Sequence, residues 1–154
     1  MSLSEGDPAP EFAMPATNGC TVSLSTLRGR PFVLYFYPRA DTPGCTEEAC
    51  SFQEALPHLE GLGLDVIGVS KDAMGPIERF AATFKLTFPL ASDQSGVAEA
   101  YGAWVEKSMY GKRYMGVDRS TVLVDRDGRV ARVWRKVKVK GHAAEVLAAA
   151  QALG

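Results

Sequence analysis

The run of apolar and aromatic residues from Phe32 to Tyr37 constrains the fold of this chain more than any other feature. A strand without polar alternation must be covered on both faces, so the run predicts the centre of a sheet that lies between other layers. Turn residues follow at 41–44, and Phe52, Leu56 and Leu59 then recur at helical spacing. A buried strand followed directly by a helix indicates an α/β fold.

Pattern and turn residues predict the remaining elements. Asn18-Gly19 predicts a hairpin within the turn-rich residues 1–30, and Arg126-Asp127-Gly128 predicts a second hairpin. Pro57 lacks an amide hydrogen, so we expect it to kink or break the first helix, which extends to about residue 62. The expected fold is a central mixed β-sheet flanked by helices, with an N-terminal β-hairpin extension. Further strands are expected at 64–69, 88–91, 121–125 and 130–134, helices at 76–84, 97–101 and 143–153, and loop or core positions for Trp104, Tyr110 and Tyr114.

Composition and charge limit the classes of function. The 154 residues contain no repeat or long linker, and we expect one domain spanning residues 1–154. The formal net charge is -1, which gives no general attraction for nucleic acid or an anionic membrane. No apolar run approaches the roughly 20 residues that span a bilayer, and the N-terminus lacks a signal pattern, so a cytoplasmic location is expected. In such a reducing compartment, three cysteines indicate chemistry or metal binding rather than a disulfide framework.

The segment that ends in Cys45 lies where the buried strand stops and the helix starts, a favoured place for sites in α/β sheets. Unpaired amide groups and the positive end of the helix dipole favour the thiolate form of Cys45. Gly44 lets a substrate approach the backbone, and the Thr42 hydroxyl can face the sulfur or cap the helix. These features predict a nucleophilic Cys45; the alternative is a structural cysteine packed at a helix start.

The first turn of this helix also carries two acidic residues, Glu47 and Glu48, which repel a nearby thiolate. A fixed cation is therefore expected close to the sulfur. Arg39 is near in sequence, and Arg119, just ahead of a predicted strand, could be near in space. Arginine suits the role because it stays charged and donates to two oxygens at once. The residues alone do not decide between Arg39 and Arg119 as this cation. Without further information, the interpretation favoured for Arg119 is an ordinary surface arginine.

Cys50 follows Cys45 by five residues. In an intact helix this spacing separates the two Cα atoms by roughly 8–9 Å. A disulfide spans less than about 7 Å, so a turn of helix must unwind if the two cysteines are to pair. The alternative for Cys50 is a small core residue. Cys20 has no evident role, and His58 and His142 are not at ligand spacing, so no zinc site is expected.

This segment resembles the active-site motif of the peroxiredoxins, P-x-x-x-T-x-x-C, which is met by Pro38, Thr42 and Cys45. The longer run T-P-G-C-T-x-E-x-C-x-F, from Thr42 to Phe52, is similar to the peroxiredoxin Q class, also called bacterioferritin comigratory protein. The segment Arg119-Ser-Thr-Val-Leu-Val-Asp125 resembles the same class, so the likeness spans nearly the whole chain.

The resemblance implies a thioredoxin-like fold and a thiol peroxidase that reduces hydrogen peroxide and organic hydroperoxides in antioxidant defence. It implies that Cys45 is the peroxidatic cysteine and that Cys50 resolves it in an intramolecular disulfide. It also implies thioredoxin as the reductant, a monomeric state, and neither a metal nor an organic cofactor. The other site residues expected from it are Thr42 and Arg119 as catalytic groups and Pro38 and Gly44 at the substrate.

Two other functions stay open on the residues. A thiol–disulfide oxidoreductase on a similar fold would prefer C-x-x-C, a spacing that this chain lacks. A redox sensor or holdase would use the same disulfide as a signal. The number of peroxide molecules consumed per protein molecule separates an enzyme from a sensor.

Overall fold

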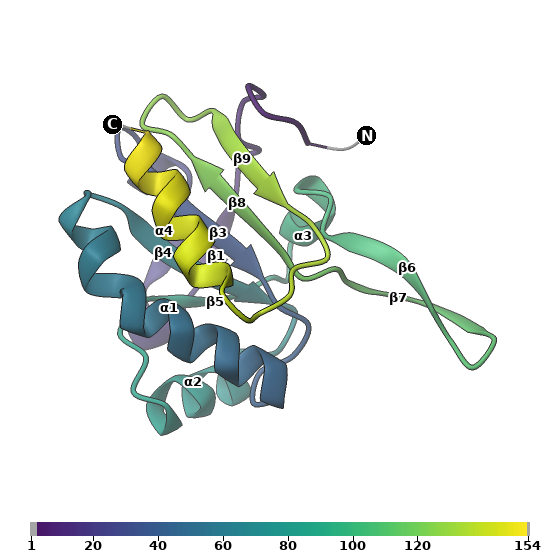
Figure 1. The fold of residues 1–154 in the computed structure, drawn as a ribbon. Coiled ribbons are helices and arrows are strands. Elements are labelled where there is room, and N and C mark those ends of the chain that lie inside the picture. Colours follow the sequence, from purple (N-terminus) through teal and green to yellow (C-terminus); the bar gives the residue numbers. More distant parts are fainter. Residues whose placement is uncertain (1–2, 154) are drawn as a thin grey trace.

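The computed structural model describes residues 3–153, and a five-stranded mixed sheet forms its centre (Figure 1). The strands are β3 Phe32–Phe36, β4 Asp65–Ser70, β5 Leu90–Ser92, β8 Ser120–Val124 and β9 Val130–Trp134. They lie in the order β5-β4-β3-β8-β9. The first three run parallel, whereas β8 is antiparallel to β3 and β9 is antiparallel to β8. The expected mixed sheet and the hairpin around residues 126–128 are confirmed.

Strand β3 occupies the middle of the sheet and is buried along its whole length, as its uniformly apolar sequence requires. It pairs with β4 on one side and with β8 on the other. In the second pairing Phe36 lies opposite Ser120. Strand β8 therefore starts beside the carboxyl end of β3. Arg119, the residue before β8, lies at this end of the strands, where the chain leads from β3 into the first helix.

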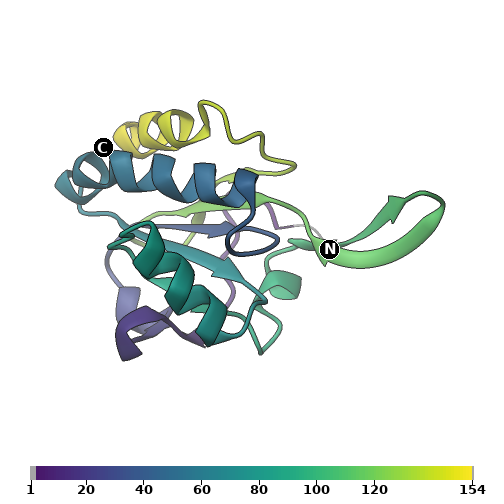
Figure 2. The same ribbon diagram turned by 90° about the horizontal axis from the view of Figure 1, so that it is seen from below.

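Helices α1 (Pro43–Gly61) and α4 (His142–Ala152) lie side by side on one face of the sheet (Figure 2). Their side chains, among them Phe52, Leu59 and Val146, belong to one buried cluster with Val33 and Leu123 of the sheet. No helix within residues 3–153 is both long and apolar enough to cross a membrane.

A kink or a break was expected at Pro57; helix α1 continues through this proline, so the break does not occur. Leu56 and Leu59, on either side of Pro57 in the last turns, are both buried in the core beneath α1. Packing of this kind outweighs local propensity in most protein helices, which explains why the helix persists past a residue that disfavours it.

The opposite face is covered by the N-terminal segment and by helix α3 (Val97–Ala100). Strands β1 (Ala13–Pro15) and β2 (Thr21–Ser23) pair antiparallel around the 3-10 turn η1 (Thr17–Gly19), which confirms the N-terminal hairpin. Asn18 and Gly19 both adopt positive φ, 64° and 69°, as their residue types allow. A second 3-10 turn, η2 (Ser25–Leu27), leads to β3, and helix α2 (Met74–Thr83) packs against β5 and η1.

A two-stranded arm, β6 (Trp104–Met109) and β7 (Lys112–Val117), projects from the body of the molecule in both views (Figures 1 and 2). The sequence patterns predicted no strands here. The loop position of Tyr110 and the core packing of Trp104 are confirmed, whereas Tyr114 lies in strand β7 and its expected loop or core position is wrong. Tyr110 and Gly111 form the turn with φ values of 52° and 77°, and the Tyr110 side chain is 98% exposed. Tyr114 is also exposed, and Trp104 at the root of the arm is partly buried.

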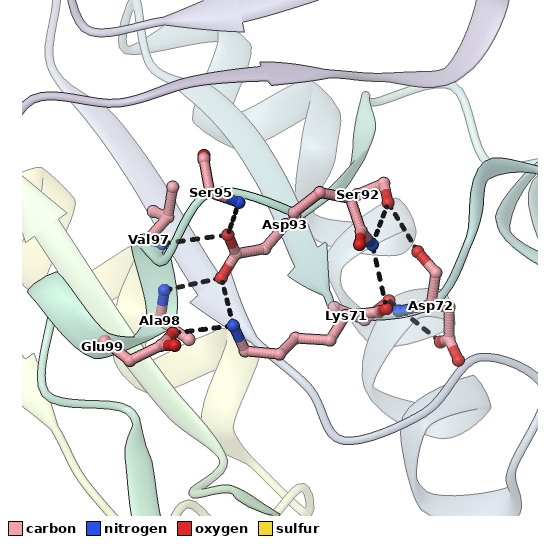
Figure 3. Close-up of polar contacts among 10 residues, drawn as sticks. Lys71, Asp72, Ser92, Asp93, Ser95, Val97, Ala98 and Glu99 are labelled. Carbon is pink, nitrogen blue, oxygen red and sulfur yellow. Dashed lines mark hydrogen bonds and ion pairs between the residues drawn. The ribbon is translucent and has the colours of Figure 1, made fainter.

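The root of the arm is held by a polar network at the carboxyl ends of β4 and β5 (Figure 3). The buried carboxylate of Asp93 accepts hydrogen bonds from the amides of Ser95, Val97 and Ala98, which open helix α3. Lys71 lies 3.1 Å from Asp93 and 2.7 Å from Glu99, and its ammonium group also lies over the Trp104 ring. The network ties the sheet, α3 and the arm together.

Candidate active site

Cys45 is the third residue of α1, and its side chain is 2% exposed. Thr42 is the N-cap with extended backbone angles, and Pro43 is the first helical residue, where a missing amide hydrogen costs nothing. The helix starts a short loop after the buried strand β3, so Cys45 belongs to the first turn, whose amides lack partners within the helix.

Arg119 joins Cys45 to Glu48. Its Nη2 donates to Cys45 Sγ at 3.3 Å, and its Nη1 lies 2.7 Å from Glu48 Oε1. A Cβ atom at Gly44 would lie 3.3 Å from Nη2, so the absence of a side chain there gives the guanidinium its space. The cation nearest the sulfur is thus Arg119, while the side chain of Arg39 is exposed to solvent. The pairing of β8 with β3 places Arg119 beside Cys45.

Glu48 is almost completely buried, and only one of its oxygens is bonded. Burial raises the pKa of Glu48 from 4.5 to about 7, with Arg119 opposing the rise. Oε2 has no hydrogen-bond partner within residues 3–153. Burial alone would lower the pKa of Arg119, but Glu48 and Cys45 hold it above its ordinary value. One guanidinium therefore contacts both the Glu48 carboxyl group and the Cys45 sulfur.

Tyr35 in strand β3 and Tyr37, the residue after the strand, belong to the same buried cluster as Cys45. Burial raises the pKa of Tyr35 and of Tyr37, and the charges of Glu48 and Cys45 add to the rise, so both hydroxyls stay protonated. Neither hydroxyl has a partner in the part of the chain that the structure describes. The Tyr35 ring stacks on Phe52 of α1 with centroids 4.6 Å apart, which fixes the base of the site.

The loop between β3 and α1 is held by two hydrogen bonds. The Ala40 amide donates to Asp72 Oδ2 at 2.7 Å, and the Thr42 hydroxyl donates to the Arg39 carbonyl at 2.8 Å. Thr42 thus occupies the N-cap position without a side-chain cap bond, and its hydroxyl bonds the loop rather than the sulfur. Pro38 is exposed at the start of the same loop.

All three cysteines are free thiols. Cys50 is half-buried within the unbroken helix α1, five residues after Cys45. Cys20 is exposed on the N-terminal hairpin, where its Sγ is 3.8 Å from the Asn18 carbonyl. Within residues 3–153 no three His, Cys, Asp or Glu side chains are grouped as ligands of a metal ion.

Three contributors to this site were not identified in the sequence. Glu48 was treated only as a charge that repels the thiolate, although its position three residues after Cys45 places both on one helix face. Asp72 and Tyr37 gave no local signal, because their contacts with the site depend on how β3 and β4 are paired.

The chain is similar to known proteins over nearly its whole length. The profile of the AhpC/TSA family matches residues 5–133. The chain is 43% identical to peroxiredoxin Bcp of Bacillus subtilis and 40% identical to peroxiredoxin Bcp of Escherichia coli. The alignments cover 96% of this chain and 94% of the first relative, and 91% and 90% for the second.

Solved structures show the same likeness. The bacterioferritin comigratory protein of Xanthomonas campestris, studied for alkyl peroxide reduction, is 39% identical with a TM-score of 0.88, covering 92% of this chain and 90% of that one. A PrxQ variant from Xylella fastidiosa is 34% identical with a TM-score of 0.92, covering 99% of this chain and 98% of that one.

Proposed function

This chain belongs to the AhpC/TSA family, among the Bcp and PrxQ peroxiredoxins, and on that premise we propose that Cys45 reduces hydroperoxides and forms a disulfide with Cys50. The chain is a thiol peroxidase with the thioredoxin-like fold of its relatives, as the motif predicted. The proposal concerns which residues perform the reaction, which reductant restores them, and how the fold permits the disulfide.

The observation that carries the proposal is the contact of Arg119 with the buried Cys45. A thiolate is the nucleophilic form of cysteine, and a fixed guanidinium at 3.3 Å stabilises it without reorganisation. The second arm of the guanidinium is held by Glu48, so its orientation is set before substrate arrives. Cys50 and Cys20 make no hydrogen bond to a cation within residues 3–153, which distinguishes Cys45 from both.

The peroxidatic step follows from this geometry. The Cys45 thiolate attacks the terminal oxygen of the hydroperoxide, the O–O bond breaks, and Cys45 becomes a sulfenic acid while the alkoxide takes a proton and leaves as an alcohol. Arg119 donates to the developing negative charge. Pro38 and Gly44 border the approach to the sulfur, and the Thr42 hydroxyl turns from the Arg39 carbonyl to a substrate oxygen.

Resolution requires a change of shape. Cys45 and Cys50 both lie within α1, and an intact helix holds their Cα atoms farther apart than a disulfide allows. The turn between them unwinds, the Cys50 thiol gives up its proton, and its sulfur attacks the sulfenic sulfur. The S–O bond breaks, and the displaced hydroxide takes up a proton to leave as water while the disulfide forms. A dithiol of the thioredoxin type then supplies two electrons and restores both thiols.

The remaining expectations belong to the same proposal. The formal net charge of -1 is consistent with a cytoplasmic protein that binds neither nucleic acid nor membrane. We expect a monomer that needs no metal or organic cofactor, since the reaction as proposed uses only side chains of this chain, the hydroperoxide and the dithiol reductant.

The test is mass spectrometry of reduced protein after one equivalent of hydrogen peroxide, combined with turnover in the presence of thioredoxin. Wild type should lose two hydrogens and turn over many times. Cys45→Ser should not react, and Cys50→Ser should gain oxygen at Cys45 and stall with thioredoxin. Cys20→Ser, an exposed thiol outside the site, serves as the matched control and should behave as wild type. Persistent turnover in Cys45→Ser, or a disulfide that involves Cys20, overturns the assignment.

A further inference from the structure

Three lysines form an exposed row beside the site. The segment 135–141 leads from β9 to α4 and passes the end of the molecule at which α1 begins and the arm departs (Figures 1 and 2). Lys136, Lys138 and Lys140 are all exposed, whereas Val137 and Val139 between them are half-buried. None of the three lysines makes an ion pair within residues 3–153. We call these three residues the basic strip.

The basic strip is fixed to the active-site arginine. The Val137 amide donates to the Arg119 carbonyl at 2.9 Å, in the middle of the strip. Just before the strip, Arg135 Nη2 donates to the Tyr101 carbonyl at 2.6 Å, next to the root of the arm. The backbone that carries the strip is therefore tied to the residue whose side chain contacts Cys45.

Charge is divided unequally along the chain. Residues 104–141 contain eleven Lys and Arg against four Asp and Glu, whereas residues 3–103 contain six against thirteen. The overall balance near zero hides this division. Arg126 and Arg129 lie at the β8–β9 turn, at the end of β8 far from Arg119. Residues 104–119 and 135–141, which hold the arm, Arg119 and the basic strip, contain eight Lys and Arg against two Asp and Glu. A partner that approaches Cys45 from this side meets a positive field.

The arm adds an apolar surface to this positive side. Cross-strand partners share a face, and one face of the arm pairs Lys107 with Tyr114 and Met109 with Lys112. This face carries no carboxylate. Tyr110 at the tip is 98% exposed and Met109 is 56% exposed, and Tyr114 and Met115 beside them are exposed as well, so apolar side chains are grouped at this end of the arm. Cationic and apolar side chains together fit a macromolecule rather than a small thiol.

We propose that the basic strip and the cationic face of the arm dock an acidic protein dithiol, which reduces the Cys45–Cys50 disulfide. This inference rests on the proposed function, because the oxidised site needs two electrons from outside. One partner thiolate attacks the disulfide and forms a mixed disulfide, while the other cysteine of this chain leaves as a thiolate. The second partner thiolate then displaces this chain, so that the partner ends as a disulfide and both cysteines are reduced. Docking beside Arg119 brings the partner sulfur to the cysteine that is otherwise buried.

The experiment compares two reductants on one variant. Lys136→Glu, Lys138→Glu and Lys140→Glu are combined, and hydrogen peroxide turnover is measured with a bacterial thioredoxin and, separately, with dithiothreitol. The thioredoxin rate divided by the dithiothreitol rate should fall at least tenfold from its wild-type value, because charge reversal slows association that a field has steered. In wild type the thioredoxin rate should fall steeply with added salt, and in the variant it should not.

The matched control reverses three exposed cations that lie outside residues 104–141, Arg28→Glu, Arg79→Glu and Lys85→Glu, for the same change of net charge. It should keep the wild-type ratio. A thioredoxin whose carboxylates near its cysteines are replaced by lysine should regain rate with the strip variant. Equal loss with both reductants, or an unchanged ratio, overturns the docking surface. So does a variant that is impaired only with a fatty-acid hydroperoxide, since the strip would then select an anionic substrate. Absence of turnover in wild type with either reductant would instead overturn the proposed function.

Discussion

Glu48 should make the stability of the reduced protein depend on pH near neutrality. A carboxyl group whose pKa is raised on folding stabilises the protein fully below its unfolded pKa, and that contribution is lost as pH rises through the folded value. For Glu48 the window runs from 4.5 to about 7. The full shift corresponds to about 3 kcal/mol, at roughly 1.4 kcal/mol for each pH unit, and about 2–3 kcal/mol of it falls between pH 5 and pH 8.

The assay is urea unfolding of wild type and Glu48→Gln at pH 5 and pH 8, both in a Cys45→Ser background so that no thiol titrates at this site. The free energy of unfolding of the protein that retains Glu48, relative to that of the Glu48→Gln variant, should fall by about 2–3 kcal/mol between the two pH values. Other titrating groups cancel in this comparison. Glu47→Gln, an exposed neighbour, is the control and should show a change below about 0.5 kcal/mol. A constant difference for Glu48 would show that Arg119 keeps the carboxylate ionised throughout and that burial does not dominate its charge.

Three further outcomes are expected. Arg119→Met should lower the second-order rate constant with hydrogen peroxide, measured by competition kinetics, by about 100-fold or more. The rate constant of Arg39→Met should stay within about threefold of the wild-type value, and similar losses in both variants would mean that the 3.3 Å contact of Arg119 with Cys45 has no role. Amide hydrogen exchange from Cys45 towards Pro57 should be faster in oxidised than in reduced protein, since the disulfide cannot form across an intact turn, and equal protection contradicts the unwinding. Asp93→Asn should lower the free energy of unfolding by about 3 kcal/mol in urea titrations, because it removes the negative charge of a carboxylate that pairs with Lys71 and accepts hydrogen bonds from three backbone amides. Asp127→Asn, on an exposed turn, is the control, and equal effects of the two substitutions would contradict the role of the network.

Elements with a local signature could be predicted from the sequence. Strand β3 is apolar throughout, and Arg126-Asp127-Gly128 is flanked by β-branched residues, so both appeared where they were expected. The arm could not be recognised in this way, because it has no core face and its strands are mostly exposed on both sides. Its turn places Tyr110 at φ 52°, a conformation that usually calls for Asn or Gly, so the turn carried no signal either.

The site was predictable to the extent that it is contiguous. Thr42, Gly44 and Cys45 lie in one motif at a helix start, and the chemistry of that motif can be judged without knowledge of the fold. The partnership of Arg119 with Glu48 depends on the register of β8 against β3, which no local pattern specifies. The raised pKa of Glu48 could not be predicted from the sequence either, because it results from burial of the side chain in the folded protein.

The register that places Arg119 beside Cys45 also orders events during synthesis. The two residues are 74 positions apart, so a ribosome that adds 5–20 residues each second delivers the guanidinium roughly 4–15 s after the thiol. Until β8 has emerged and docked on β3, a nascent chain carries Cys45 without the cation that stabilises its anion. The sulfur thus acquires its cationic partner only after β8 has been synthesised, and an oxidant that meets the chain earlier meets a cysteine without its guanidinium.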